Sequence, residues 1–217
     1  MIKEIALRER TQSLGEEIAN SVSHGIALLA AVAGAPVLVL SAVRQGGSAR
    51  IAGASVFAAA MVLLYLTSTL YHALPNNRAK RVFQVLDRAA IFLMIAGTYT
   101  PFTLGVLRGT WGWTLFGLVW GLAFAGVVLT AVGGVRYPKL STGLYLAMGW
   151  LILIAVKPLW LRVPSWGLFW LLAGGIAYTV GVVFYAAKRV CFSHFVWHLF
   201  VITGTACHFI AVLRFAA

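Results

Sequence analysis

Two histidines four residues apart, His194 and His198, form the most chemically suggestive pair in the sequence. On a helix, residues spaced i and i+4 project from one face. Two imidazoles placed in this way can bind one metal ion, and the spacing suits zinc. A lone histidine in an apolar helix more often forms a hydrogen bond between helices. The pair therefore predicts a metal site only if further ligating side chains lie at its level.

Asp87 is the second residue that points to chemistry. It is the only aspartate in 217 residues, and it lies in the apolar stretch 82–107. A carboxylate inside a bilayer costs about 2.5–3.5 kcal/mol on insertion scales, so such residues are usually paired and functional. An acid retained in this position predicts a functional site within a membrane segment.

The composition indicates the elements that must position these groups. The chain is 61% hydrophobic and 10% charged, with a mean hydropathy of +0.92. These values are typical of an all-α polytopic membrane protein. The sequence predicts a single seven-transmembrane helix bundle over residues 1–217, because all the loops are short. The seven apolar stretches long enough to span a bilayer are residues 20–43, 49–74, 82–107, 111–132, 140–160, 165–187 and 193–215.

The charge pattern excludes one class of partner and predicts an orientation. The net charge of +12 arises mainly from the scarcity of acids, of which there are five. Lys and Arg are spread over short loops instead of clustering on one face, so we expect no nucleic-acid partner. With the N-terminus inside, ten Lys and Arg lie on the inner side and six on the outer side. This excess predicts an N-in/C-out topology.

Alternation of the spans brings five side chains to one membrane depth. His72 ends the second span, and Asp87 lies in the first two turns of the third. His194 and His198 open the seventh span, and His24 lies about one turn into the first. All of these positions fall at the same end of the bundle, whichever way the bundle is oriented. Shared depth makes His72 the expected third metal ligand.

Each residue in this group has an expected role. Three histidines with one open position form the catalytic type of zinc site. Ser68 lies one turn before His72 on the same face and can hydrogen-bond a water molecule there. Asp87 can accept a proton from that water or orient it.

Two further side chains are candidate auxiliary ligands, and a third is not. His24 has the right depth but no partner at i+4. Cys191 shares a helical stripe with His194 and His198 at the spacing i, i+3, i+7, although a cysteine in this position is more often a small apolar residue at the helix entrance. His208 lies about 15 Å deeper than His198 by helical rise, so we expect it to form a structural hydrogen bond.

Taken together, these motifs resemble the hemolysin III branch of the progestin and adipoQ receptor (PAQR) family. The resemblance covers nearly the whole chain. The motifs that carry it are Glu17-x-x-Asn20-x-x-x-His24, Ser68-x-x-x-His72, Asp87 early in the third span, and His194-x-x-x-His198.

The resemblance implies a zinc ion held by His72, His194 and His198, with Asp87 contacting it through water and Ser68 nearby. In the adiponectin receptors of this family, similar sites are associated with ceramidase-like hydrolysis of lipid amides. The resemblance also implies a multi-pass protein of the cell (inner) membrane. Together with the predicted topology, it puts the zinc site toward the cytoplasm and makes membrane lipids the expected partners.

Three functions remain open from the sequence. The first is a zinc-dependent intramembrane hydrolase of a lipid amide or ester. The second is a non-enzymatic membrane-homeostasis or sensor protein with structural zinc. The third is a channel or haemolytic pore, which the concentration of polar residues at one depth disfavours.

Overall fold

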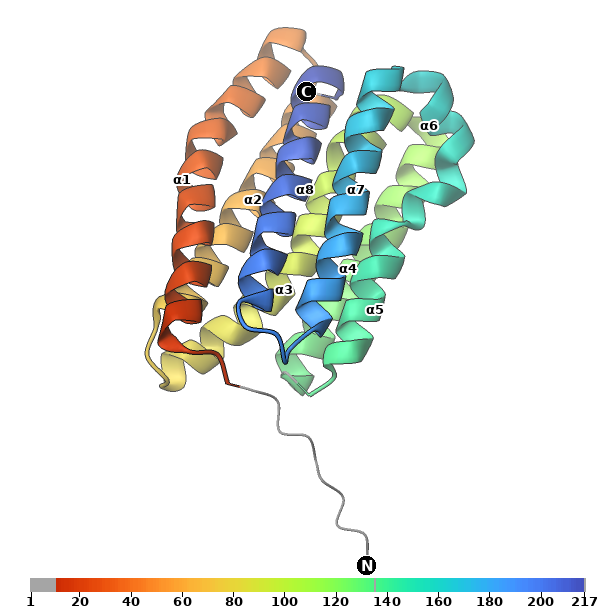
Figure 1. Cartoon of the computed structure of the whole chain (residues 1–217). Helices are drawn as coiled ribbons and strands as arrows, with labels where there is room; N and C mark the ends of the chain where they lie inside the picture. Colours follow the sequence, from red (N-terminus) through yellow and green to blue (C-terminus); the bar gives the residue numbers. More distant parts are fainter. Residues whose placement is uncertain (1–10, 135, 217) are drawn as a thin grey trace, which may run out of the picture.

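The computed structural model describes residues 11–134 and 136–216, and every regular element in these ranges is a helix. Seven helical segments are long and apolar enough to cross a membrane, as predicted. Figure 1 shows them as one bundle. The segments are α1 (Leu14–Gln45), α2 (Ser48–Ala73), α3 (Arg78–Thr100) with a π-helical continuation (Pro101–Leu107), α4 (Gly109–Gly133), α5 (Pro138–Gly149) followed by a 3₁₀ segment (Leu151–Ala155) and α6 (Val156–Arg162), α7 (Ser165–Ala186) and α8 (Ser193–Phe215).

The first span begins earlier than its apolar stretch suggests. Helix α1 starts at Leu14 instead of residue 20, because Ser13 and Glu16 form a capping box. The Glu16 backbone N–H donates to Ser13 Oγ at 3.3 Å, and the Ser13 N–H donates to Glu16 Oε2 at 2.8 Å. These two bonds satisfy donors that would otherwise be unpaired at the helix start. The first turn of α1 therefore includes two glutamates, Glu16 and Glu17.

The order of packing places the ends of four helices together. Helix α1 lies along α2, α2 along α3, and α7 along α8, while α1 also contacts α8. The third span is the most enclosed, whereas α1 exposes many apolar side chains, as expected for a helix that faces lipid. Helix α2 ends at the same end of the bundle at which α1, α3 and α8 begin, the lower end in Figure 1.

The fifth span is broken, although its apolar stretch predicts one continuous helix over residues 140–160. It passes from α5 through the 3₁₀ segment into α6, which frees backbone groups within the membrane-spanning part of the chain. The Tyr99 hydroxyl accepts the Ile152 N–H at 2.8 Å and lies 2.9 Å from the Met148 carbonyl. Irregular backbone at membrane depth is tolerated where protein satisfies it, so Tyr99 stabilises the break.

The N-in/C-out orientation stays a prediction. Three of the basic residues that favour it, Lys3, Arg8 and Arg10, lie outside the described residues.

Candidate metal centre

Three histidines converge where α2 ends and α8 begins. His72 lies in the last turn of α2, and His194 and His198 lie in the first two turns of α8. One ring nitrogen from each lies within 4.8 Å of the others. The rings are 4.7–5.2 Å apart between centroids and tilted by 52–71° to one another. A tetrahedral ion with bonds of about 2.0–2.1 Å holds its ligand nitrogens roughly 3.4 Å apart, so this group could hold a metal ion if its nitrogens moved closer together.

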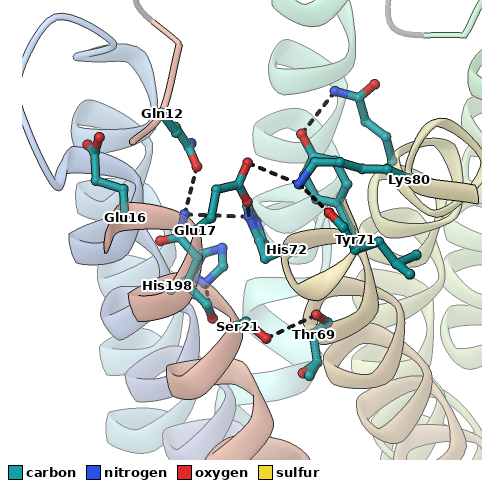
Figure 2. Close-up of polar contacts among 12 residues, drawn as sticks. Gln12, Glu16, Glu17, Ser21, Thr69, Tyr71, His72, Lys80 and His198 are labelled. Atoms are coloured by element: carbon teal, nitrogen blue, oxygen red, sulfur yellow. Dashed lines mark hydrogen bonds and ion pairs between the residues drawn. The ribbon is translucent and has the colours of Figure 1, made fainter. Parts of the chain in front are cut away.

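Glu17 determines which nitrogen His72 can offer. Its Oε2 lies 2.7 Å from His72 Nδ1, as Figure 2 shows. Because a carboxylate only accepts hydrogen bonds, Nδ1 carries the proton and Nε2 presents a lone pair. Nε2 is buried and has no hydrogen-bond partner among the described residues. A carboxylate behind a histidine is the arrangement that orients metal-binding imidazoles in proteins.

Lys80 holds Glu17 in place. Its Nζ lies 3.1 Å from Glu17 Oε1 and 3.2 Å from the carbonyl oxygen of Leu74. Lys80 lies in the first turn of α3 and Leu74 directly follows α2. The orientation of His72 thus depends on one hydrogen-bonded chain that joins α1, α2 and α3 (Figure 2).

The His198 ring is oriented by the backbone of α1. Its Nδ1 lies 3.3 Å from the carbonyl oxygen of Asn20 and 3.5 Å from Ser23 Oγ. A carbonyl can only accept, so Nδ1 donates and Nε2 is left for a ligand. His198 is 2% exposed and so makes this contact away from bulk solvent.

Glu16 connects the start of α1 to the start of α8. Its Oε1 accepts the Phe192 backbone N–H at 2.7 Å. Phe192 precedes α8 with a left-handed backbone, φ 58°, which non-glycine residues rarely adopt without support. Two adjacent glutamates therefore act on the two helices that carry the three histidines: Glu17 on α2 and Glu16 on α8.

Sequence reasoning missed these two roles. Glu17 appeared only as a member of a motif, and Glu16 was not singled out. Two signals were present in the sequence: the Ser13-x-x-Glu16 pattern of a capping box, and the placement of two of the five acids at the entrance of a membrane span.

Ser68 and Asp87 lie beside the histidines but outside the group that can share one ion. The Ser68 side chain interacts with the Asp87 carboxylate, and Asp87 is close enough to His72 for their charges to interact. Ser68 is buried, whereas Asp87 is partly exposed. This placement allows Asp87 to exchange a proton with a molecule at the site.

A cavity of about 360 Å³ extends into the bundle from His194, His198, Ser68 and Asp87. Most of its lining is apolar and comes from the third, fifth, sixth and seventh spans, including the broken segment of the fifth span. It extends toward α6, at the opposite end of the bundle (Figure 1). The polar side chains that line its near end include His24, Ser68, Asp87, Arg88, His194 and His198.

The structure separates Cys191 from the other expected residues. Cys191 is exposed and precedes α8, which begins at Ser193. The expected stripe with His194 and His198 was wrong, because the left-handed Phe192 interrupts the helical spacing. A role as auxiliary ligand stays a prediction for Cys191 and for His24.

His208 Nε2 lies 3.2 Å from the Leu171 carbonyl, the kind of structural hydrogen bond expected for it.

Replacing Glu17 with alanine should weaken metal binding, because the acceptor that orients His72 is lost. We expect the affinity of the purified protein for added Zn²⁺ to fall by about 10–100-fold, measured by competition with a chromogenic chelator. Glu17→Gln keeps an oxygen that can accept from Nδ1 and should lose less. Equal affinities in the wild type and both variants would show that Glu17 does not orient the ligand.

Comparison with known proteins places the chain in a family. The model of the family described as "Haemolysin-III related" matches residues 12–209. The chain is 42% identical over 203 residues to "Hemolysin-3" of Bacillus cereus, covering 94% of this chain and 93% of that protein. It is 43% identical over 201 residues to "Hemolysin-3 homolog" of Bacillus subtilis (strain 168), covering 93% and 94%.

A more distant relative matches over nearly the same length. The chain is 26% identical over 210 residues to "Monocyte to macrophage differentiation factor" of Homo sapiens, covering 92% of this chain and 84% of that protein. This similarity agrees with the hemolysin III branch of the PAQR family. The match over most of the chain, together with the seven-span bundle that carries the motifs, shows that this protein belongs to the haemolysin-III-related family.

Proposed function

We propose that this protein is a zinc-dependent hydrolase of a lipid amide or ester, located in the cell (inner) membrane with its site toward the cytoplasm. One observation carries the proposal: the only aspartate of the chain, His194 and His198 line the polar end of a largely apolar cavity, and His72 completes the group of histidines that could hold a metal ion. Perturbed or costly polar groups that gather in such a cavity are the usual mark of a reaction site.

The donor set fits zinc. Three imidazole nitrogens are the ligands of one common type of catalytic zinc site, in which a fourth position is left open. The hydrogen bonds at Nδ1 of His72 and His198 leave Nε2 of each for the ion. When bound, zinc would supply Lewis acidity, which activates water and polarises a carbonyl group.

Asp87 is suited to carry the proton. In the proposed reaction, it accepts a proton from a water molecule as the water oxygen bonds to the carbonyl carbon. The C–N bond of an amide, or the C–O bond of an ester, then breaks. The proton passes from Asp87 to the leaving nitrogen or oxygen, which gives a carboxylic acid and an amine or alcohol. Ser68 holds the carboxylate through its side-chain interaction.

The cavity is suited to hold the apolar part of such a substrate. Its volume of about 360 Å³ falls within the range of small-molecule sites, roughly 300–1,000 Å³. Apolar walls favour a hydrocarbon chain, because burying it removes apolar surface from water. The polar end then places the hydrolysable bond beside Asp87 and the histidines.

A structural metal in a membrane-homeostasis protein is the second candidate, and one observation favours it. Helices α2 and α8 make little direct backbone contact, and α1 packs against both. An ion shared by His72 and the α8 histidines would fasten two helices that otherwise depend on α1. Structural metal contributes folding free energy in this way.

Turnover separates the two candidates. We expect the wild type to hydrolyse at least one member of a panel of N-acyl lipids and matched esters in detergent micelles. Asp87→Asn and His194→Ala should each lose at least about 100-fold, the contribution expected of a general base or a metal ligand. Thr203→Ala is a matched control on α8, because Thr203 is exposed and its hydroxyl bonds only its own helix, at the Leu199 carbonyl.

The opposite result would favour the structural candidate. In that case the zinc-loaded wild type would hydrolyse no member of the panel, and its melting temperature would fall when zinc is chelated. Turnover that survives both substitutions would contradict the proposed roles of Asp87 and His194.

Cys191 provides a test of which side the site faces. It is exposed between α7 and α8, at the end of the bundle that holds the histidines, whereas Cys207 is buried. If the site faces the cytoplasm, a membrane-impermeant maleimide should label inside-out vesicles and not intact cells. Cys191→Ser should abolish the labelling. Labelling of Cys191 in intact cells would reverse the orientation.

A further inference from the structure

His24 occupies an unusual position at the polar end of the cavity. It is 3% exposed and lies on α1, and it lines the same cavity as Ser68 and Asp87. Neither of its ring nitrogens forms a hydrogen bond with a described residue. The backbone of His198 lies near the His24 ring, but it does not meet the distance and angle criteria for a hydrogen bond with either nitrogen. Buried polar groups in proteins are nearly always hydrogen-bonded, so both nitrogens call for a partner.

The stacking of His24 on His198 disfavours a shared metal ion. The two rings are nearly parallel, at 11°, and their centroids are 3.6 Å apart. An imidazole binds a metal along its own ring plane at about 2.0–2.1 Å. Parallel planes separated in this way cannot both pass through one ion. The rings of His72, His194 and His198, tilted by 52–71° to each other, can converge on one.

The ring of His24 is also held on a second side. The Tyr65 ring meets it edge-on, at 79° and with centroids 5.1 Å apart. Tyr65 is 2% exposed, so this contact belongs to the packed interior. Contacts with two rings fix the plane of His24 while leaving its nitrogens unused. Such a side chain is preorganised to bind a further group.

We propose that His24 is a substrate-contacting residue that hydrogen-bonds an oxygen of the polar headgroup of an N-acyl lipid in the cavity, and that it is not a metal ligand. A neutral imidazole offers one donor and one acceptor. The donor suits the carbonyl or hydroxyl oxygen of the headgroup, while the apolar cavity holds the acyl chain. This assignment deepens the proposed function and rests on it for the class of ligand.

Two substitutions separate the effect of the His24 ring from the effect of its nitrogens. His24→Phe keeps a flat ring that can stack on His198 but removes both nitrogens. His24→Asn removes the ring but keeps a hydrogen-bonding amide. Size-exclusion profiles and melting temperatures establish which variants are folded before any binding measurement. Zinc content per chain then tests the metal-ligand role directly, without reference to activity.

Equilibrium binding tests the proposed contact without requiring turnover, with every compared protein carrying Asp87→Asn so that the amide probe is not hydrolysed. The probes are an N-acylethanolamine with a fluorescent acyl chain and a matched fluorescent alkane without the headgroup. We expect His24→Phe to weaken binding of the amide probe by about tenfold, the equivalent of one hydrogen bond. Its affinity for the alkane and its zinc content should match the wild type, and His24→Asn should recover part of the amide affinity.

Three results would overturn the proposal. Loss of zinc from His24→Phe would make His24 a metal ligand. Equal weakening of both probes would reduce its role to packing. A wild type that does not prefer the amide to the alkane would remove the headgroup contact. Because binding is measured at equilibrium, failure of hydrolysis and failure of this contact are told apart.

Discussion

The contact between Glu17 and His72, 2.7 Å from carboxylate oxygen to ring nitrogen, is the interaction on which the site depends. A carboxylate near the end of a membrane-spanning bundle is costly unless its charge is paired and hydrogen-bonded. Lys80 supplies the opposite charge, and His72 donates a hydrogen bond. The same contact fixes the proton of His72 on Nδ1, so the buried Nε2, which has no hydrogen-bond partner among the described residues, keeps its lone pair free. One hydrogen bond thus both stabilises the Glu17 carboxylate and orients the His72 ring.

The arrangement of the other side chains around the three histidines depends on where α1 begins. The capping box starts the helix at Leu14 and places Glu16 and Glu17 in its first turn. Glu17 reaches the end of α2, and Glu16 reaches the residue before α8. Helix α1 also supplies the carbonyl that orients His198 and the ring of His24. A helix that exposes much of its surface to lipid therefore organises the ligands carried by two others.

Much of this arrangement was predictable from the sequence, and the reasons are specific. Alternation of apolar spans placed His72, Asp87 and the His194–His198 pair at one end of the bundle, because that inference needs only helix direction. The network around Glu17 was not predictable, because it depends on side chains reaching across three helices. The break in the fifth span was also missed, because a hydroxyl from another span, that of Tyr99, satisfies its freed backbone. Cys191 was misplaced since helical spacing was extended past a residue with a left-handed backbone.

Metal content is the most direct test of the account. Protein purified in detergent without a chelator would be examined by mass spectrometry as wild type, His198→Ala and Thr203→Ala. The account predicts one zinc ion per chain in the wild type and in Thr203→Ala, and its loss in His198→Ala, because three protein ligands are needed to hold the ion. A wild type without zinc, or a His198→Ala variant that retains it, would contradict the assignment of the three histidines as a metal centre.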